Sequence, residues 1–161
     1  MTILISPQRI ELTPSTRVIF LAGSIEMGKA EDWQQRVAHL IEAIDPSIVV
    51  ANPRRTVWDS SWVQSIDNPV FKEQVDWELD HLERADLAVF YFQGGTQSPI
   101  TLLELGKHLE RADASQSTLV CCPENFWRKG NVDIACHRRG AETPSTTLED
   151  LIARIEAWAR R

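Results

Sequence analysis

Residues 85–106 read ADLAVFYFQGGTQSPITLLELG, and this stretch decides the fold of the 161-residue chain. Residues 87–92 form an unbroken apolar run rich in valine and aromatic residues, which is typical of a strand buried on both faces in a parallel sheet. Residues 93–97 carry turn residues. Ser98 and Pro99 then favour a helix start, with serine as N-cap and proline at the first helical position. The stretch therefore predicts a strand, a loop and a helix.

Glu104 falls in the second turn of that helix, among Leu102, Leu103 and Leu105. Most helical glutamates are solvated, so a surface position is the plain alternative. However, open α/β sheets bind ligands at the carboxyl ends of their strands, where this helix begins. Gly106 follows, and a glycine inside a helix costs about 1 kcal/mol and often marks a close approach by backbone or ligand. We therefore predict that Glu104 borders a site.

Composition narrows the class of protein. The length suits one domain over residues 1–161, and the net charge of −6 argues against a nucleic-acid polymer as partner. No apolar run approaches the roughly 18 residues of a membrane span, and no signal peptide is recognisable. The three cysteines form no CxxC motif, which favours a reducing cytoplasm. The histidines and cysteines do not have the spacing of metal ligands, and the chain has no P-loop and no GxGxxG fingerprint. We therefore expect no metal and no cofactor.

Strand and helix patterns alternate along the chain. Strands are expected at 17–22, 47–51, 87–92 and 117–122, with a brief fifth near 141–143. Helices are expected at 31–44, 70–84, 98–112 and 146–160, with a short one after Asn131. The predicted buried stripe of the second helix comprises Phe71, Val75, Leu79 and Leu82. Residues 1–16 are an N-terminal extension, in which 3–12 reads as an extended segment without an evident role.

This alternation predicts a flavodoxin-like, Rossmann-like α/β fold with a parallel sheet between two helical layers. The expected strand order is 2-1-3-4-5, which places the switch point between the first and third strands. The loops that follow those strands, residues 23–25 and 93–98, should line one crevice.

Two further carboxylates accompany Glu104. Glu78 lies at the edge of the predicted stripe, as either a surface residue or a partner that orients Glu104 or contacts a sugar hydroxyl. Asp86 opens the central strand, far from the crevice, where a capping role is favoured. Two carboxyl groups near an anomeric carbon suit glycosidic chemistry, in which one of them attacks the carbon.

Three segments carry a family resemblance: VIFLAGSI at 18–25, Glu78 ahead of ADLAV at 85–89, and SPITLLELG at 98–106. The chain resembles the nucleoside 2-deoxyribosyltransferases and the related N-glycosidases that cleave nucleoside 5′-monophosphates. The resemblance spans residues 17 to about 122. It implies that Glu104 attacks C1′ of the sugar, and that Glu78, at a position often held by Asp, contacts the sugar and orients the nucleophile. It also implies that the first loop, comprising Gly23, Ser24 and Ile25, faces the base or sugar.

Ser98 occupies a position where the base-exchanging enzymes often carry Asp and the monophosphate-cleaving relatives carry Ser. A hydroxyl at a helix N-terminus suits phosphate binding, but Ser98 is equally well explained as an N-cap. Asn52 and Arg54 follow the second strand, where an arginine could reach an anion or simply lie at the surface. Trp58 and Trp62 could stack on a base or pack in a core or interface.

The tryptophan-rich connection at 52–69 and the aromatic pair at 126–127 place apolar side chains outside the regular elements. Such material often marks an interface, so we expect a homo-oligomer. Family members complete their sites with residues of a neighbouring subunit, a role that the resemblance suggests for Asn131.

Three functions remain open from the sequence. The first is transfer of a (deoxy)ribosyl group from a nucleoside to another base or water through a covalent intermediate on Glu104. The second is hydrolysis of nucleoside 5′-monophosphates. The third is a catalytically silent flavodoxin-like module that binds a nucleotide or a protein.

Overall fold

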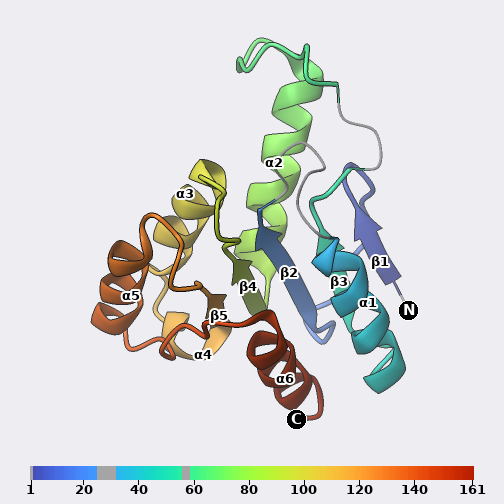
Figure 1. Ribbon diagram of the computed structural model, residues 1–161. Helices are drawn as coiled ribbons and strands as arrows, with labels where there is room; N and C mark the ends of the chain where they lie inside the picture. Colours follow the sequence, from blue (N-terminus) through green and yellow to red (C-terminus); the bar gives the residue numbers. More distant parts are fainter. Residues whose placement is uncertain (1, 25–31, 56–58) are drawn as a thin grey trace.

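A five-stranded, all-parallel sheet forms the centre of the computed structural model, which describes residues 2–24, 32–55 and 59–161 (Figure 1). The strand order is β1-β3-β2-β4-β5, and the flavodoxin-like α/β prediction is confirmed. The strands are β1 (Thr2–Ile5), β2 (Val18–Gly23), β3 (Val49–Asn52), β4 (Leu87–Tyr91) and β5 (Thr118–Cys121). The last four correspond to the four main predicted strands, in the predicted relative order.

The fifth strand is not the predicted one. β1 comes from the N-terminal extension and pairs with β3 at the edge opposite to β5, with Ile5 facing Asn52. Its sequence, TILI, is rich in the β-branched residues that favour strands. Residues 141–144 form no strand and end in a proline, which cannot donate to a ladder. A single parallel bridge joins Cys121 to Ser145 there, in which the Cys122 N–H donates to the Ser145 carbonyl at 2.8 Å.

Helices cover both faces of the sheet (Figure 1). Residues 19 and 21 of β2 face a core shared with α1 and α6, whereas residues 18, 20 and 22 face the core beneath the other helices. This alternation is what a central strand buried on both faces requires. The helices are α1 (Trp33–Ile44), α2 (Pro69–Arg84), α3 (Pro99–His108), α4 (Ala114–Ser117), α5 (Lys129–Arg138) and α6 (Leu148–Ala159). None of the helices in the described ranges has the length and apolar character needed to cross a membrane.

The buried face of α2 differs from the predicted stripe. Phe71, Val75 and Leu79 are only partly buried. The fully buried residues are Gln74, Trp77, His81 and Leu82. The polar members tolerate burial because they are paired: the His81 ring stacks on Trp77 at 4.0 Å, and its Nδ1 bonds to the Trp77 carbonyl at 2.7 Å. Relative to the predicted stripe, the buried face is rotated about the axis of α2, and Glu78 lies closer to its middle.

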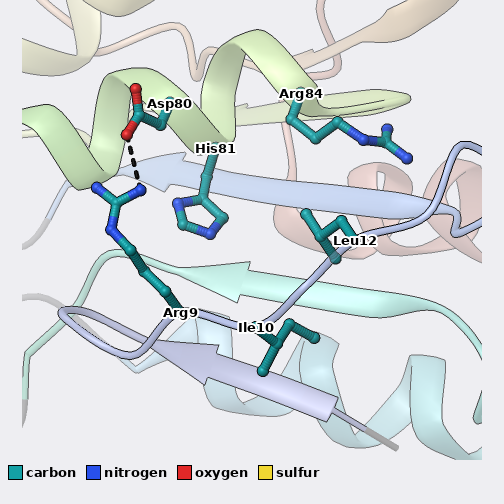
Figure 2. Close-up of a pocket in the computed structure, with 6 residues that line it drawn as sticks. All are labelled: Arg9, Ile10, Leu12, Asp80, His81 and Arg84. Atoms are coloured by element: carbon teal, nitrogen blue, oxygen red, sulfur yellow. Dashed lines mark hydrogen bonds and ion pairs between the residues drawn. The ribbon is translucent and has the colours of Figure 1, made fainter.

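Residues 6–16, here called the N-terminal strap, run along α2 after β1. Trp77 Nε1 donates to the Gln8 carbonyl at 2.6 Å, and Arg9 pairs with Asp80 at 2.7 Å. Arg84, near the end of α2, donates to the carbonyls of residues 13 and 16. Figure 2 shows the strap facing Asp80, His81 and Arg84 of the helix. The N-terminal extension is thus bound to α2 at successive turns.

Candidate active site

The site lies where β2 and β4, neighbours in the sheet, lead the chain away in opposite directions. Gly23 ends β2 opposite Tyr91 of β4, and the Ser24 N–H donates to the Tyr91 carbonyl at 3.0 Å. The chain continues from β2 to β3 on one side and from β4 to β5 on the other. This is the topological switch point of the sheet, where ligands bind in open α/β folds.

Gly23 is buried against α1. A Cβ added at this position would lie 2.6 Å from a Trp33 ring carbon and 2.9 Å from the Tyr91 carbonyl oxygen. Tight packing is therefore sufficient to explain the glycine, in addition to the substrate contact predicted for it. Ile25, the last predicted residue of this loop, and Trp58 lie outside the described residues.

Three hydroxyl groups, those of Ser24, Thr96 and Ser98, converge at the switch point and are called the hydroxyl triangle below. Ser24 Oγ lies 2.5 Å from Ser98 Oγ and 3.0 Å from Thr96 Oγ1. Ser98 Oγ and Thr96 Oγ1 are 2.9 Å apart. The Gln93 N–H donates to Ser24 Oγ at 3.1 Å, and Thr96 Oγ1 donates to the Gln93 carbonyl at 2.7 Å. The two predicted loops therefore contact each other. Thr96 takes part in this contact, although it was not among the predicted site residues.

Ser98 precedes α3, as predicted, but its hydroxyl does not cap the helix. Its φ of 46° and ψ of 51° put the backbone in the left-handed region, and its side chain makes no capping hydrogen bond. The side chain turns instead to Ser24 and Thr96. Pro99 does occupy the first helical turn. Because left-handed backbone is unfavourable for a residue with a Cβ, the hydroxyl triangle stabilises a strained entry into α3.

Glu104 is buried on α3, with 6% of its surface exposed. Burial and, to a smaller extent, the negative charge of Glu78 raise its pKa from 4.5 to about 8. Leu105 is buried beside it, whereas Leu103 is 68% exposed and contributes no desolvation. The proton affinity of Glu104 is therefore raised by a second carboxylate as well as by burial.

Glu78 is the partner of Glu104 from α2. Burial raises its pKa to about 7, against the opposing effects of a hydrogen bond from Gln74 and the charge of Arg55. Gln74 Nε2 donates to Glu78 Oε1 at 2.7 Å. The two carboxylates repel each other, so at neutral pH the pair holds protons that isolated carboxylates would release.

Arg55 is the arginine beside the carboxylate pair, and sequence reasoning passed over it in favour of Arg54. Its side chain is 9% exposed and lies over the ring of Trp62, 5.3 Å from the centroid. It also pairs with Glu73 at 3.3 Å. The adjacency of two arginines after a strand gave no means of telling which of them turns inward.

Asn52 and Arg54 are joined to each other at the end of β3. Asn52, 6% exposed, accepts a hydrogen bond from the Arg54 N–H at 2.9 Å, and the Arg54 guanidinium lies 3.9 Å from Asp32. Asp86 accepts from the Val18 N–H at 2.8 Å at the opposite end of the strands. The predicted structural role of Asp86 is confirmed.

Asn131 is exposed on α5 and makes no hydrogen bond to the other predicted site residues within the described part of the chain. The segment before it does approach the site loop, because Trp127 Nε1 donates to the Gln97 carbonyl at 3.0 Å. Gly106 is exposed, and apart from its chain neighbours and the backbone of its own helix no described atom would lie within 4 Å of an added Cβ. The close backbone approach expected at Gly106 is therefore not found.

Two cavities of the described structure lie away from the carboxylate pair. One of about 260 Å³ is bounded by the N-terminal strap and α2 (Figure 2). Another of about 780 Å³ lies at the end of the sheet where Asp86 is found. The described residues contain no cluster of three or more histidines, cysteines or carboxylates that could hold a metal ion. The chemical groups of the candidate site are thus the buried Glu104 carboxylate, the partly buried Glu78 carboxylate and three hydroxyls.

The sequence and the fold of the chain have relatives among known proteins. The model of a family described as nucleoside 2-deoxyribosyltransferase like matches residues 16–126, more than half of the chain. A conserved protein from Enterococcus faecalis V583 has a solved structure with a TM-score of 0.51 and 14% identity, covering 89% of this chain and 88% of that chain. At this identity the likeness concerns the fold. A comparison with curated proteins found no match.

Proposed function

The chain belongs to the nucleoside 2-deoxyribosyltransferase-like family, and on that premise we propose that it cleaves the N-glycosidic bond of a nucleoside through Glu104. The (deoxy)ribosyl group passes to Glu104 as a covalent ester and then to a second base or to water. The observation that carries this proposal is a carboxylate 94% buried at the switch point, beside a second carboxylate.

The chemistry requires two displacements at C1′. A Glu104 carboxylate oxygen bonds to C1′ as the C1′–N bond breaks, and the departing base takes up a proton from solvent water. A nitrogen of an incoming base, or a water oxygen, then bonds to C1′, releases the carboxylate and gives its proton to solvent. Because each step inverts C1′, the product of transfer keeps the β configuration.

Protonation of the carboxylate pair sets the active form. The nucleophile must be an anion, whereas burial and mutual repulsion favour protons on both groups. We assign Glu78 to orient Glu104 and contact the sugar, with Gln74 and Arg55 favouring its ionised form. With Glu78 ionised, its repulsion holds the Glu104 anion at high energy until the cationic character developing at C1′ stabilises it.

A nucleoside 5′-monophosphate is the second candidate substrate, and the hydroxyl triangle favours it. Its three hydroxyls lie at the N-terminus of α3, where backbone N–H groups and the helix dipole favour an anion. In this case the phosphate binds near Ser98 and Ser24, and water accepts the sugar.

Release of free base tests the proposed function. The protein is incubated with deoxynucleosides and deoxynucleoside 5′-monophosphates, each with and without a second base, and the products are separated by chromatography. We expect base release from one of the two substrate classes and a β-configured product when an acceptor is present. A 2-fluoro sugar analogue should leave a glycosyl adduct on Glu104, detected by peptide mass spectrometry. An α-configured product would contradict double displacement, and no release from any substrate would favour a silent binding module.

We also propose that the protein is a homo-oligomer. Large apolar side chains are exposed on α3, on α5 and its approach, and on the connection before α2: Ile100, Leu103, Trp127, Ile134, Val63 and Ile66. Burying such side chains against a second copy is the most economical way to remove them from water. Light scattering at micromolar concentration is expected to give a mass of at least two chains, and Leu103→Glu should lower it. A monomeric mass for the wild-type protein would contradict the proposal.

A further inference from the structure

We infer that Ser6 and Gln74 are positioning residues for Glu78, so that the N-terminal strap takes part in the working of the candidate site. Ser6 Oγ donates to Gln74 Oε1 at 2.5 Å, and Gln74 Nε2 donates to Glu78 Oε1 at 2.7 Å. The inference rests on the proposed function, because that proposal gives Glu78 its role. Ser6 precedes the region that matches the family, which begins at residue 16.

The Gln74 amide has one possible orientation. The side chain is buried, with 3% exposed, and its Nε2 also donates to the Pro53 carbonyl at 3.1 Å. Because a carbonyl oxygen only accepts, the amide atom that faces Pro53 must be the nitrogen. The same nitrogen faces Glu78, and the amide oxygen faces Ser6, whose hydroxyl must then donate. Three hydrogen bonds therefore lock the amide with an N–H directed at Glu78.

Ser6 is held in turn by the sheet. It is 4% exposed, and its N–H donates to the Asn52 carbonyl at 3.4 Å, where β1 and β3 end. Its carbonyl accepts from Arg55 Nε at 3.4 Å. The strap beyond Ser6 is bound to α2 at Trp77 and Asp80. The hydroxyl that orients Gln74 is thus fixed by the edge strand and by the helix that carries Glu78.

The charges around Glu78 explain why this donor matters. The charge of Glu78 raises the pKa of Glu104 on α3, and Arg55, from the connection between β3 and α2, attracts the Glu78 carboxylate. Gln74, on its own helix, supplies a hydrogen bond that favours the ionised carboxylate. Without this bond, only the charge of Arg55 opposes the effect of burial on the pKa of Glu78. The carboxylate would then hold its proton to higher pH and lose the constraint on its rotamer.

Direct titration of Glu78 tests the inference without any substrate. Side-chain carboxyl ¹³C signals of the full chain are followed against pH by NMR, and the Glu78 signal is assigned by its loss in Glu78→Gln. Gln74→Met is expected to raise the midpoint of the Glu78 titration by about one pH unit, and Ser6→Ala by less. Ser6→Thr keeps the hydroxyl and should retain the wild-type midpoint. Gln8→Met and Ser15→Ala make the same chemical changes on exposed strap residues and should leave it unchanged.

Kinetics provide the second readout. In Gln74→Met, kcat should fall about tenfold with KM nearly unchanged, and the acid limb of the pH profile should move to higher pH together with the Glu78 midpoint. If Gln74→Met does not fold, Ser6→Ala decides the question alone. A wild-type Glu78 midpoint in folded Gln74→Met and Ser6→Ala, or equal shifts in the two strap controls, would overturn the inference. Absence of glycosidic activity would contradict the proposed function but leave the titration result standing.

Discussion

The Glu104→Gln variant is expected to lose at least about a thousandfold in kcat for glycosidic cleavage while keeping the wild-type fold. Glutamine has the size of glutamate but cannot form the ester with C1′, so the step that breaks the glycosidic bond has no nucleophile. The substitution replaces one buried polar group with another of the same size and deletes no apolar group, so packing around α3 should survive. Base release under single-turnover conditions measures the loss, and circular dichroism checks the fold.

Glu83→Gln is the matched control. Glu83 lies on α2 and pairs with Lys107 of α3, but its side chain is 64% exposed. An exposed pair contributes at most about 1 kcal/mol, so this variant should keep the wild-type rate. Glu104→Asp keeps a carboxylate but withdraws it by one methylene, and an intermediate rate is expected. A Glu104→Gln rate within tenfold of wild type would remove Glu104 from the role of nucleophile.

The interior of the sheet could be predicted because each central strand is buried on both faces, and continuous apolar runs identify such strands directly. The edges could not be predicted in this way. β1 is four residues long and contributes to the sheet from a segment with no pattern beyond TILI. At the other edge, residues 141–143 were expected to pair with β5, but the structure has a single bridge at Ser145. An edge strand forms where a segment reaches the unpaired backbone N–H and C=O groups at the edge of the sheet. Which segment does so is decided by the tertiary structure.

The buried polar residues of α2 show a second limit. A stripe based on hydrophobicity selects Val75 and Leu79, but Gln74 and His81 occupy the buried face because the structure supplies their hydrogen bonds. Those partners come from the strap, from Pro53 and from the helix itself, and no spacing within α2 indicates them. Glu78 could be identified as a candidate from its motif, whereas the groups that set its pKa could not.

The entry into α3 shows why a residue type can be read correctly and its contact missed. Serine before proline predicts a helix start, and α3 does begin at Pro99. The left-handed backbone at Ser98 turns its hydroxyl toward Ser24 on a different loop, which is a long-range contact. Local capping and long-range pairing use the same hydroxyl, so the sequence could not distinguish them.

The two carboxylates should also make stability depend on pH. The pKa of Glu104 rises from 4.5 to about 8 on folding and that of Glu78 to about 7, so the folded state binds more protons than the unfolded chain above pH 4.5. Stability therefore falls as pH rises through this range. Two buried histidines oppose this trend below pH 6.5: burial lowers the pKa of His81, and that of His108 to about 4, so protons favour the unfolded chain there. The effect of the carboxylates should be uncompensated between pH 6.5 and pH 8.

We expect the free energy of unfolding of the wild-type protein to fall by about 2 kcal/mol between pH 6.5 and pH 8, since one proton displaced over one pH unit corresponds to about 1.4 kcal/mol. The larger part of this change belongs to Glu104, because Glu78 has its midpoint near pH 7 and is already partly ionised at pH 6.5. Urea denaturation at the two pH values measures the change in the wild-type protein, in Glu104→Gln and in Glu83→Gln. The first variant should lose most of the decrease and be the more stable protein at pH 8, whereas the second should follow the wild type. The buried thiols of Cys122 and Cys136 do not interfere, because burial raises their pKa from 9.0 to about 12 and about 11. Equal slopes in the wild type and Glu104→Gln would mean that Glu104 is ionised in the folded protein at pH 6.5, contrary to the protonation expected from its burial beside Glu78.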